Sequence, residues 1–286
     1  MTLGTDKRGT HAIDVAFGDA RAEGRCALIT YLTLGYPSPA DSLKLVPALQ
    51  AGGADIIELG VPFSDPVADG PTIQRASHAA LQAGVTPTHC LKLAARLRHM
   101  GVCVPLLLMG YYNPIYRHGL AKYARDCAEA RVDGLIVPDL PLEEAGPLGR
   151  ACGREGIALV FLVAPSTGEE RIARIAAATQ GFLYVISRLG TTGAGRNPGQ
   201  ELSSRLALVR RHAQTPVAVG FGISRPEQAR ALAPQVNGII VGSAIVERAS
   251  EGAKAVRSYV ASLREVMSRG QDTEAPGWKP VGNGSS

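Results

Sequence analysis

Three carboxylic acids, Glu58, Asp65 and Asp69, follow Asp55 within one short segment, residues 55–74, whose sequence is DIIELGVPFSDPVADGPTIQ. Its apolar, β-branched start, Ile56 and Ile57, is typical of a buried parallel strand, and Glu58 follows at the expected end of that strand. A carboxylate is costly to bury there, so Glu58 is a candidate proton donor or acceptor. The alternative is a strand-end carboxylate held by backbone donors or an arginine. Burial would raise its pKa and a nearby cation would lower it, so the sequence leaves its protonation state open.

Asp65 and Asp69 follow in a stretch that five helix- and strand-breaking residues interrupt: Gly60, Pro62, Pro66, Gly70 and Pro71. We therefore expect both aspartates on an ordered, irregular loop. Either could be a second catalytic acid, because loop aspartates also accept hydrogen bonds from nearby backbone N–H groups. Spacing alone does not separate the two.

Glycine-rich runs follow the last two expected strands, GFGIS at residues 220–224 and GSA at residues 242–244. Backbone N–H groups exposed just before a helix can hold a phosphate group. A glycine after a strand often marks only a tight turn, but these are also the positions where barrels commonly bind phosphate. A third run, SRLGTTGAGRNPG at residues 187–199, has five glycines or prolines in thirteen residues. That composition suits either a lid over bound substrate or a simply flexible loop.

The elements that must position these residues alternate along the chain. Apolar runs typical of buried strands cover residues 26–34, 55–60, 104–110, 133–139, 158–165, 182–187, 216–222 and 237–243. Helical patterns separate them, with starts at Ser38–Pro39, Thr86–Pro87 and Ser224–Pro226, an acid-rich start near residue 169, and a last helix over residues 255–267. Pro47 predicts a kink or an early end in the helix that Ser38 opens.

Eight strand–helix units with parallel strands and right-handed crossovers predict a (β/α)8 TIM barrel over residues 1–269. Ile13, Phe17 and Ala20 lie at helical spacing, which predicts an additional N-terminal helix over about residues 11–23, laid across one end of the barrel. Residues 270–286 are polar and rich in Pro, Gly and Ser, and we expect a disordered tail there.

Composition and charge exclude several classes of function. In the 286 residues, no apolar run approaches the ~20 residues of a membrane span, and the N-terminus lacks a secretory pattern, so we expect a soluble, cytoplasmic protein. Five cysteines without CxxC spacing argue against a disulfide framework or a zinc ribbon. The net charge of +5 is scattered without a basic block, which gives nucleic-acid binding little support. The histidines show no paired metal-ligand spacing.

Residues 55–74 resemble the signature of the tryptophan synthase alpha subunit family of indole-3-glycerol-phosphate lyases, and the resemblance extends over roughly residues 25–263. It implies that Glu58 is the catalytic glutamate and Asp69 the catalytic aspartate, which leaves Asp65 as a turn residue. The run containing Thr192 matches the family's SRxGxTG pattern except at Thr191, where the family usually has valine. Thr192 is therefore similar to the lid residue that closes toward the catalytic aspartate, while the change at Thr191 leaves lid closure open.

The resemblance also implies a substrate site. The positions that match residues around the indole ring are Tyr31, Ile73, Tyr111, Ile136, Tyr184 and Phe221, all expected at strand ends or in the loops that follow; for any one of them core packing is the default reading. The positions that match the phosphate site are Gly193, Gly222, Gly242 and Ser243.

The implied reaction is the reversible aldol-type cleavage of indole-3-glycerol phosphate to indole and D-glyceraldehyde 3-phosphate. The implied partner is a beta subunit that carries pyridoxal phosphate and receives indole, in an assembly of two alpha and two beta chains, with an interface on the loops after the second and sixth strands. No cofactor or metal is expected in this chain. No lysine is expected at a strand end, which disfavours a Schiff-base aldolase. The competing interpretations are a free-standing lyase, a catalytically silent activating subunit, and another phosphosugar barrel enzyme.

Overall fold

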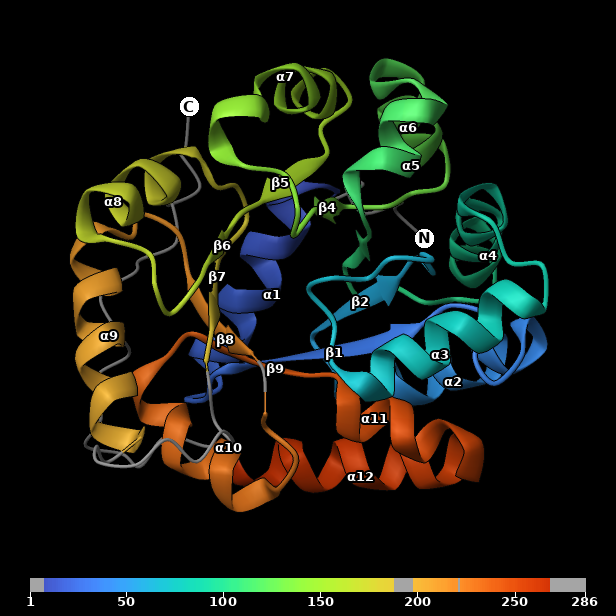
Figure 1. Cartoon of the computed structure of the whole chain (residues 1–286). Helices are drawn as coiled ribbons and strands as arrows, with labels where there is room; N and C mark the ends of the chain where they lie inside the picture. The colour runs from blue at the N-terminus through green and yellow to red at the C-terminus, as the bar shows by residue number, and fades with distance from the viewer. Residues whose placement is uncertain (1–7, 188–197, 221, 268–286) are drawn as a thin grey trace, which may run out of the picture.

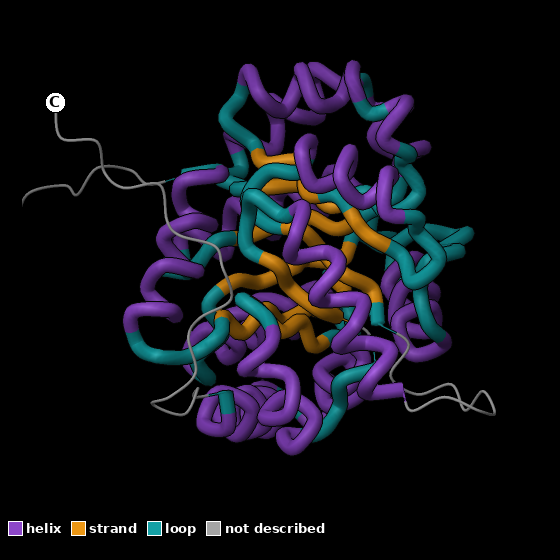
Figure 2. The backbone as a smooth tube through the Cα atoms, turned by 90° about the vertical axis from the view of Figure 1, so that its left-hand side faces the viewer, coloured by secondary structure: helices purple, strands orange, loops and turns teal. Residues whose placement is uncertain are grey.

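The computed structural model describes residues 8–187, 198–220 and 222–267. Its strands form one parallel sheet in the order β5-β4-β3-β2-β1-β9-β8-β7-β6. Their bounds are β1 Ala27–Thr33, β2 Ile56–Gly60, β3 Leu106–Met109, β4 Gly134–Ile136, β5 Ala158–Val160, β6 Leu162–Val163, β7 Leu183–Ile186, β8 Val217–Gly220 and β9 Gly238–Val241. Helices surround the strands (Figures 1 and 2). The predicted TIM barrel is confirmed.

The ring of strands closes at Phe161. The sequence predicted one strand over residues 158–165, but the structure divides it into β5 and β6 on either side of this residue. β5 pairs with β4, whereas β6 pairs with β7, so the two pieces together connect the two halves of the barrel. A backbone hydrogen bond from Tyr184 N–H to the Phe161 carbonyl, 3.1 Å long, lies at this junction.

The helices follow the predicted alternation, with two additions. Their bounds are α1 Thr10–Ala22, α2 Pro39–Ala51, α3 Pro71–Gln82, α4 Pro87–His99, α5 Tyr112–His118, α6 Leu120–Glu129, α7 Gly146–Arg154, α8 Glu169–Ala178, α9 Pro198–His212, α10 Pro226–Leu232, α11 Ser243–Arg248 and α12 Ala253–Val266, with 3-10 turns η1 Leu142–Glu144, η2 Ala233–Gln235 and η3 Ala249–Glu251. None of the helices in the described ranges has the length and apolar character needed to cross a bilayer.

Local signals placed several helix starts correctly. The Asp41 and His89 N–H groups donate to Ser38 Oγ and Thr86 Oγ1, at 3.1 and 3.3 Å, so both predicted N-caps are confirmed. The early end of this helix predicted at Pro47 was wrong, because α2 continues to Ala51.

The helices α3 and α5 were not predicted from the sequence. In the sequence Pro71 looks like a residue that interrupts helices and strands. It occupies the first turn of α3, however, where proline's missing N–H costs nothing. The helix α5 has only seven residues, too few for a clear period, and is followed by the C-cap residue Gly119, whose φ is 94°.

Strand residues alternate between two hydrophobic layers. On β2, Ile56 belongs to the cluster inside the barrel, whereas Ile57 and Leu59 belong to the larger cluster between strands and outer helices. Glu58 has the same parity as Ile56 and therefore faces the barrel interior.

The helix α1 closes the amino-terminal end of the barrel. Ile13, Phe17 and Ala20 are buried, as their spacing predicted, and the Phe17 ring lies 5.7 Å from that of Phe182 at the start of β7. The Gly9 N–H donates to the buried Asp133 carboxylate at 2.9 Å, which fixes the start of α1 near the start of β4. The structure thus leaves the opposite end, where the strands finish, as the mouth (Figure 1). The expected tail at 270–286 lies outside the described residues.

Replacing Phe17 with alanine should lower the free energy of unfolding by about 3–5 kcal/mol, because it leaves a cavity in the inner cluster. Urea denaturation followed by circular dichroism measures this change. Asp19→Ala, an exposed substitution on the same helix, should stay within about 0.5 kcal/mol of the parent. Equal losses in the two variants would show that α1 does not contribute to the core as described.

Candidate active site

Glu58 lies in the middle of β2 and not, as expected, at its end, because the strand continues to Gly60; its side chain is inside the barrel with 0% of its surface exposed. Neither carboxyl oxygen has a hydrogen-bond partner among the residues that the structure describes. The alternative of a carboxylate held by backbone donors or an arginine therefore finds no support in the described part of the chain. Burial raises the pKa of Glu58 to about 8, so the group is mainly protonated at neutral pH.

Asp69 lies on the loop between β2 and α3 and is partly buried. The Tyr111 hydroxyl donates to its Oδ2 at 3.0 Å and accepts the Ala68 N–H at 3.1 Å. Burial raises the pKa of Asp69 to about 6, and the hydrogen bond from Tyr111 opposes that rise. Asp69 is thus held by a residue from the next barrel unit and is mainly ionised at neutral pH.

Asp65 has different surroundings. It is exposed, and its Oδ2 accepts a 2.5 Å hydrogen bond from the adjacent Ser64 hydroxyl. Its backbone carbonyl accepts the Val67 N–H at 2.9 Å, which is a turn contact. The geometry therefore favours Asp69 over Asp65 as the second acid.

Two tyrosines share the interior with these acids. Burial raises the pKa of both Tyr31 and Tyr184, and the charges of Asp69 and Glu58 raise it further. Such coupling requires the four groups to lie near one another. The hydroxyl oxygen of Tyr31 also lies 3.3 Å from Thr33 Oγ1.

Glycines leave the space that the tyrosine rings occupy. A Cβ atom on Gly60 would lie 2.0 Å from the Tyr31 hydroxyl, and one on Gly220 would lie 2.5 Å from the Tyr184 hydroxyl. Gly60 is two residues beyond Glu58 and shares its inward face. A larger residue at either position would displace a ring from beside the acids.

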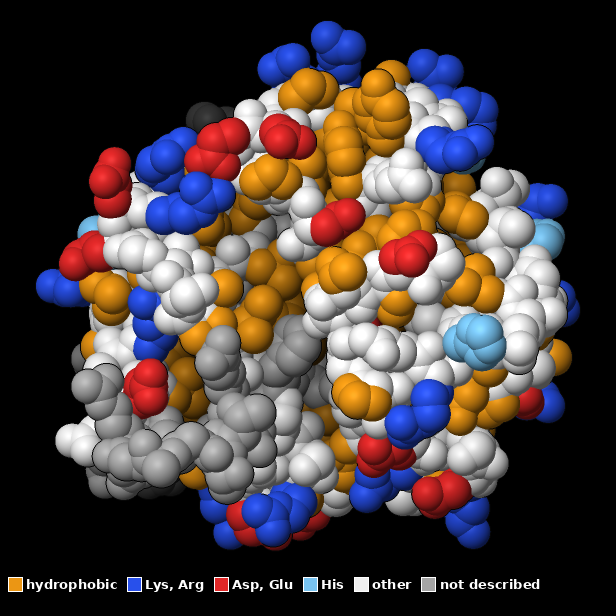
Figure 3. Space-filling model, in the orientation of Figure 1, with side chains coloured by type: hydrophobic (Ala, Val, Ile, Leu, Met, Phe, Trp, Pro, Cys, Tyr) orange, Lys and Arg blue, Asp and Glu red, His pale blue; other side chains and the backbone are white. Residues whose placement is uncertain are grey.

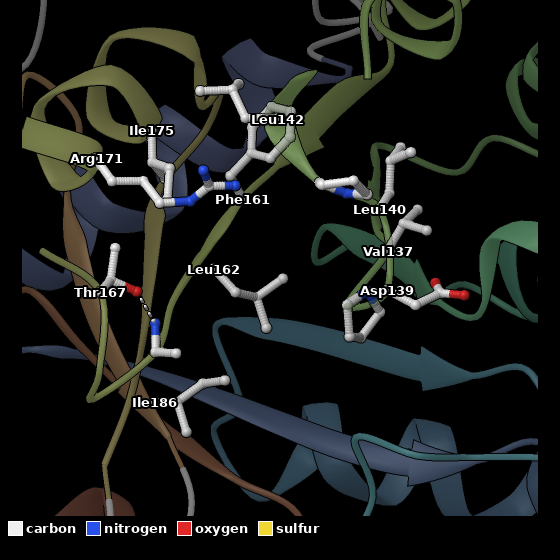
Figure 4. Close-up of a pocket in the computed structure, with 13 residues that line it drawn as sticks. Val137, Asp139, Leu140, Leu142, Phe161, Leu162, Thr167, Arg171, Ile175 and Ile186 are labelled. Atoms are coloured by element: carbon white, nitrogen blue, oxygen red, sulfur yellow. Dashed lines mark hydrogen bonds between the residues drawn. The ribbon is translucent and has the colours of Figure 1, made fainter. Parts of the chain in front are cut away.

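A cavity of about 410 Å³ lies at the mouth (Figure 4). It is lined by Val137, Pro138, Asp139, Leu140, Pro141, Leu142, Phe161, Leu162, Ala164, Thr167, Arg171, Ile175 and Ile186. Leu162 and Ile186 also pack against the inner cluster that contains Tyr31 and Tyr184, so the cavity adjoins the acids without being lined by them. Figure 3 shows apolar side chains along a hollow on this face.

The wall that these residues form around the cavity was not predicted from the sequence. The available signal was the barrel rule that residues at the carboxyl ends of strands form the site. Applied to β6 and β7, it would have indicated Leu162 and Ile186. The break at Phe161, which a continuous apolar run conceals, was not visible in the sequence.

The other predicted site residues lie on a strand, on or before helices, or outside the described residues. Ile136 on β4 and Tyr111 before α5 are buried, whereas Ile73 lies on α3 and not, as expected, at a strand end or in a loop. The reason for this correction is the helix start at Pro71. Thr191, Thr192, Gly193 and Phe221 lie outside the described residues.

The two glycine runs after β8 and β9 start from neighbouring, hydrogen-bonded strands. Gly222 is exposed with a φ of 78°, a conformation that favours glycine. Gly242 precedes α11, and Ser243 is its exposed first residue. The N–H groups of Ile245 and Val246 donate to the Gly242 carbonyl at 2.8 and 3.0 Å, so the first-turn N–H groups without an acceptor in the helix are those of Ser243 and Ala244.

No group of three His, Cys, Asp or Glu side chains placed to hold a metal occurs in the described part of the chain. All five cysteines are free, and four of them are buried.

Comparison with known proteins decides which family has this geometry. Residues 17–274 match the family model described as tryptophan synthase alpha chain. The chain belongs to this family. The alpha chain from Dehalococcoides mccartyi is 49% identical over 245 residues, which cover 85% of this chain and 96% of that relative.

Solved structures and a longer relative agree with this family assignment. A structure of Mycobacterium tuberculosis tryptophan synthase is 39% identical with a TM-score of 0.83 and covers 90% of this chain and 98% of that one. The Saccharomyces cerevisiae protein named tryptophan synthase is 42% identical over 86% of this chain, a match that covers only 35% of the yeast protein. In yeast the family's sequence is thus one part of a longer chain.

Stability should depend on pH through Glu58. The unfolded chain loses this proton near pH 4.3 whereas the folded chain keeps it to about pH 8, so the parent's free energy of unfolding falls as pH rises across that interval. Glu58→Gln cannot ionise, and we expect it to exceed the parent by more than about 2 kcal/mol at pH 9 and to match it near pH 4. Urea denaturation at both pH values measures the difference.

The matched control is Glu129→Gln, an exposed substitution at the end of α6 that should differ from the parent by less than about 0.5 kcal/mol at both pH values. A Glu58→Gln variant no more stable than the parent at pH 9 would contradict the burial of an unpartnered carboxyl.

Proposed function

We propose that this chain is the alpha subunit of tryptophan synthase and catalyses the reversible aldol-type cleavage of indole-3-glycerol phosphate to indole and D-glyceraldehyde 3-phosphate. Membership of the alpha chain family supports the activity. The observation that carries the mechanism is the fully buried Glu58 carboxyl, protonated at neutral pH and without a partner among the described residues.

Glu58 performs both proton transfers of the proposed reaction. Its proton goes first to indole C3, which converts the ring into a leaving group with a positive charge. The resulting carboxylate then takes the proton of the hydroxyl on the adjacent side-chain carbon. As the aldehyde forms, the carbon–carbon bond breaks and its electron pair neutralises the ring. Glu58 ends the cycle protonated, as it began.

Asp69 stabilises the charge that develops on the ring. Its carboxylate accepts a hydrogen bond from the indole N–H, where the positive charge of the protonated ring is concentrated. The reaction requires Asp69 ionised and Glu58 protonated, and their pKa values of about 6 and about 8 satisfy both conditions near neutral pH. At neutral pH one of the two acids is thus protonated and can donate a proton, and the other is ionised and can stabilise a positive charge.

Substrate contacts are proposed from matching family positions. Tyr31, Tyr184 and Ile136 face the inner cluster and suit the flat indole ring. The further proposed ring contacts are Ile73, Tyr111 and Phe221. The proposed phosphate contacts are the backbones of Gly193, Gly222 and Gly242 with Ser243, and Thr192 is the proposed lid residue.

Glu58→Gln should lower turnover by about 100-fold or more, because the amide cannot transfer the proton. Asp69→Asn should have a similar effect, since it keeps the shape but removes the charge. Steady-state indole release from indole-3-glycerol phosphate measures both variants, with circular dichroism to confirm folding. Asp65→Asn is the matched control and should keep near-parental turnover. A larger loss in Asp65→Asn than in Asp69→Asn would reverse the assignment of the two aspartates.

The proposed partner is a beta subunit that binds pyridoxal phosphate and takes up the indole, in an assembly of two alpha and two beta chains. The yeast relative supports a partner region, because its sequence extends well beyond the part that matches this chain. Two exposed apolar side chains lie in loops or short helices at the mouth, Val67 after β2 with 83% exposed and Tyr116 on α5 with 64% exposed. Such exposure on one face is typical of a docking surface.

A cytoplasmic location is proposed from the family and the free cysteines.

Replacing Val67 with aspartate should weaken copurification with a beta subunit and reduce its activation of indole release by about tenfold, because a charge would be buried at the interface. Met100→Asp is the matched control: Met100 is 51% exposed but precedes β3 at the opposite end of the barrel. Pull-down and the lyase rate with added beta subunit measure the effect. Equal behaviour of the two variants would exclude Val67 from the interface.

A further inference from the structure

We propose that Tyr259, on α12, is a positioning residue that connects the loops after β8 and β9 and sets the geometry in which their backbones bind the phosphate of the substrate. The inference rests on the proposed function, because it assumes that these two loops hold a phosphate. Tyr259 itself does not touch the substrate in this proposal.

The hydroxyl group of Tyr259 reaches the first loop. It donates to the backbone carbonyl of Ser224 at 2.9 Å, across 35 positions of sequence. Ser224 ends the GFGIS run, two residues beyond Gly222. One side chain of the last barrel helix thus fixes the carboxyl end of this run.

The aromatic ring of Tyr259 reaches the second loop through Arg248. The Arg248 guanidinium carbon lies 4.0 Å from the ring centroid, a cation–π contact. The Arg248 Nη1 also donates to the carbonyl of Ala244 at 2.8 Å, in the first turn of α11. Ala244 directly follows Gly242 and Ser243, so the ring supports the turn that carries the second set of phosphate contacts.

Hydrogen bonds within the first loop connect Ser224 to Gly222. Gln228 Oε1 accepts the N–H groups of Ser224 and Arg225 at 2.9 and 3.0 Å. The Gln228 amide nitrogen lies 3.4 Å from the Gly222 carbonyl, to which it donates. A displacement of Ser224 is therefore transmitted to Gly222, which is exposed and has a positive φ.

The chemistry of the phenol suits this role. Burial raises the pKa of Tyr259 to about 12, although the nearby Arg248 opposes the rise, so the hydroxyl keeps its proton at neutral pH and can donate. Removing only the hydroxyl releases Ser224 while leaving the ring under Arg248. The two connections can therefore be tested separately.

The test uses the full chain together with its beta subunit and compares Tyr259→Phe with the parent. We expect the KM for indole-3-glycerol phosphate to rise about 3- to 10-fold, the effect of one lost hydrogen bond, while kcat stays within about twofold. The dissociation constant for inorganic phosphate, measured by calorimetry on the full chain, should rise by a similar factor. The affinity for indole should not change, because the inner pocket is untouched.

Two further variants separate positioning from packing and charge. Arg248→Lys keeps a positive charge near the loops but loses the planar group above the ring, and it should also weaken phosphate binding severalfold. Ser262→Ala is the matched control, because its hydroxyl donates a 2.7 Å bond to the Tyr259 carbonyl on the same helix without reaching either loop. It should leave the phosphate affinity and both kinetic parameters at parental values.

The outcomes distinguish this inference from the proposed function. Parental KM and phosphate affinity in Tyr259→Phe would overturn the role of Tyr259 while normal indole release upheld the lyase. A parent that fails to bind inorganic phosphate would also overturn the inference. A parent that binds phosphate in a Tyr259-dependent way but releases no indole would overturn the proposed function alone.

Discussion

A carboxyl group buried inside the barrel without a hydrogen-bond partner among the described residues is the constraint on which the rest of this structure depends. Such a group is costly in free energy, and its protonated state persists only where water is excluded and the surroundings are rigid. The closed ring of strands supplies the rigidity, and α1 excludes water from the amino-terminal end through Ile13 and Phe17. The fold thereby maintains the raised pKa of Glu58.

The two ends of the barrel contribute differently to stability and to chemistry. At the amino-terminal end, Arg25 forms two hydrogen bonds of 2.6 and 2.8 Å with Asp55, and Arg264 joins Asp55 and Glu23. These ion pairs connect the last helix to the starts of the first two strands. The acids of the candidate site, Glu58 and Asp69, lie instead toward the mouth, as expected for a fold that places stability at one end and chemistry at the other.

At the mouth, glycines lie where the rings of large aromatic residues pass. Gly60 and Gly220 lack side chains where Tyr31 and Tyr184 pass, and Tyr111 extends to Asp69 from the following unit. The last helix adds Tyr259 on the outer side, beneath both glycine runs. Residues from several barrel units therefore act together, which gives the site a precision that one loop could not provide.

The sequence by itself determined the alternation of elements, the caps at Ser38 and Thr86, and the position of Glu58 on a buried strand, because periodicity and capping depend on residues only a few positions apart. It also contained the family signature around Glu58 and Asp69. It missed α3 because a proline that starts a helix and one that ends it look alike in a short window.

Only the tertiary structure decided which contacts these residues make. The hydrogen bond from Tyr111 to Asp69 spans 42 positions, and the bond from Tyr259 to Ser224 spans 35. Closure at Phe161 and the isolation of Glu58 likewise depend on strands that meet only in the folded barrel. Burial and partnership are properties of residues brought together from distant parts of the chain, so no local pattern records them.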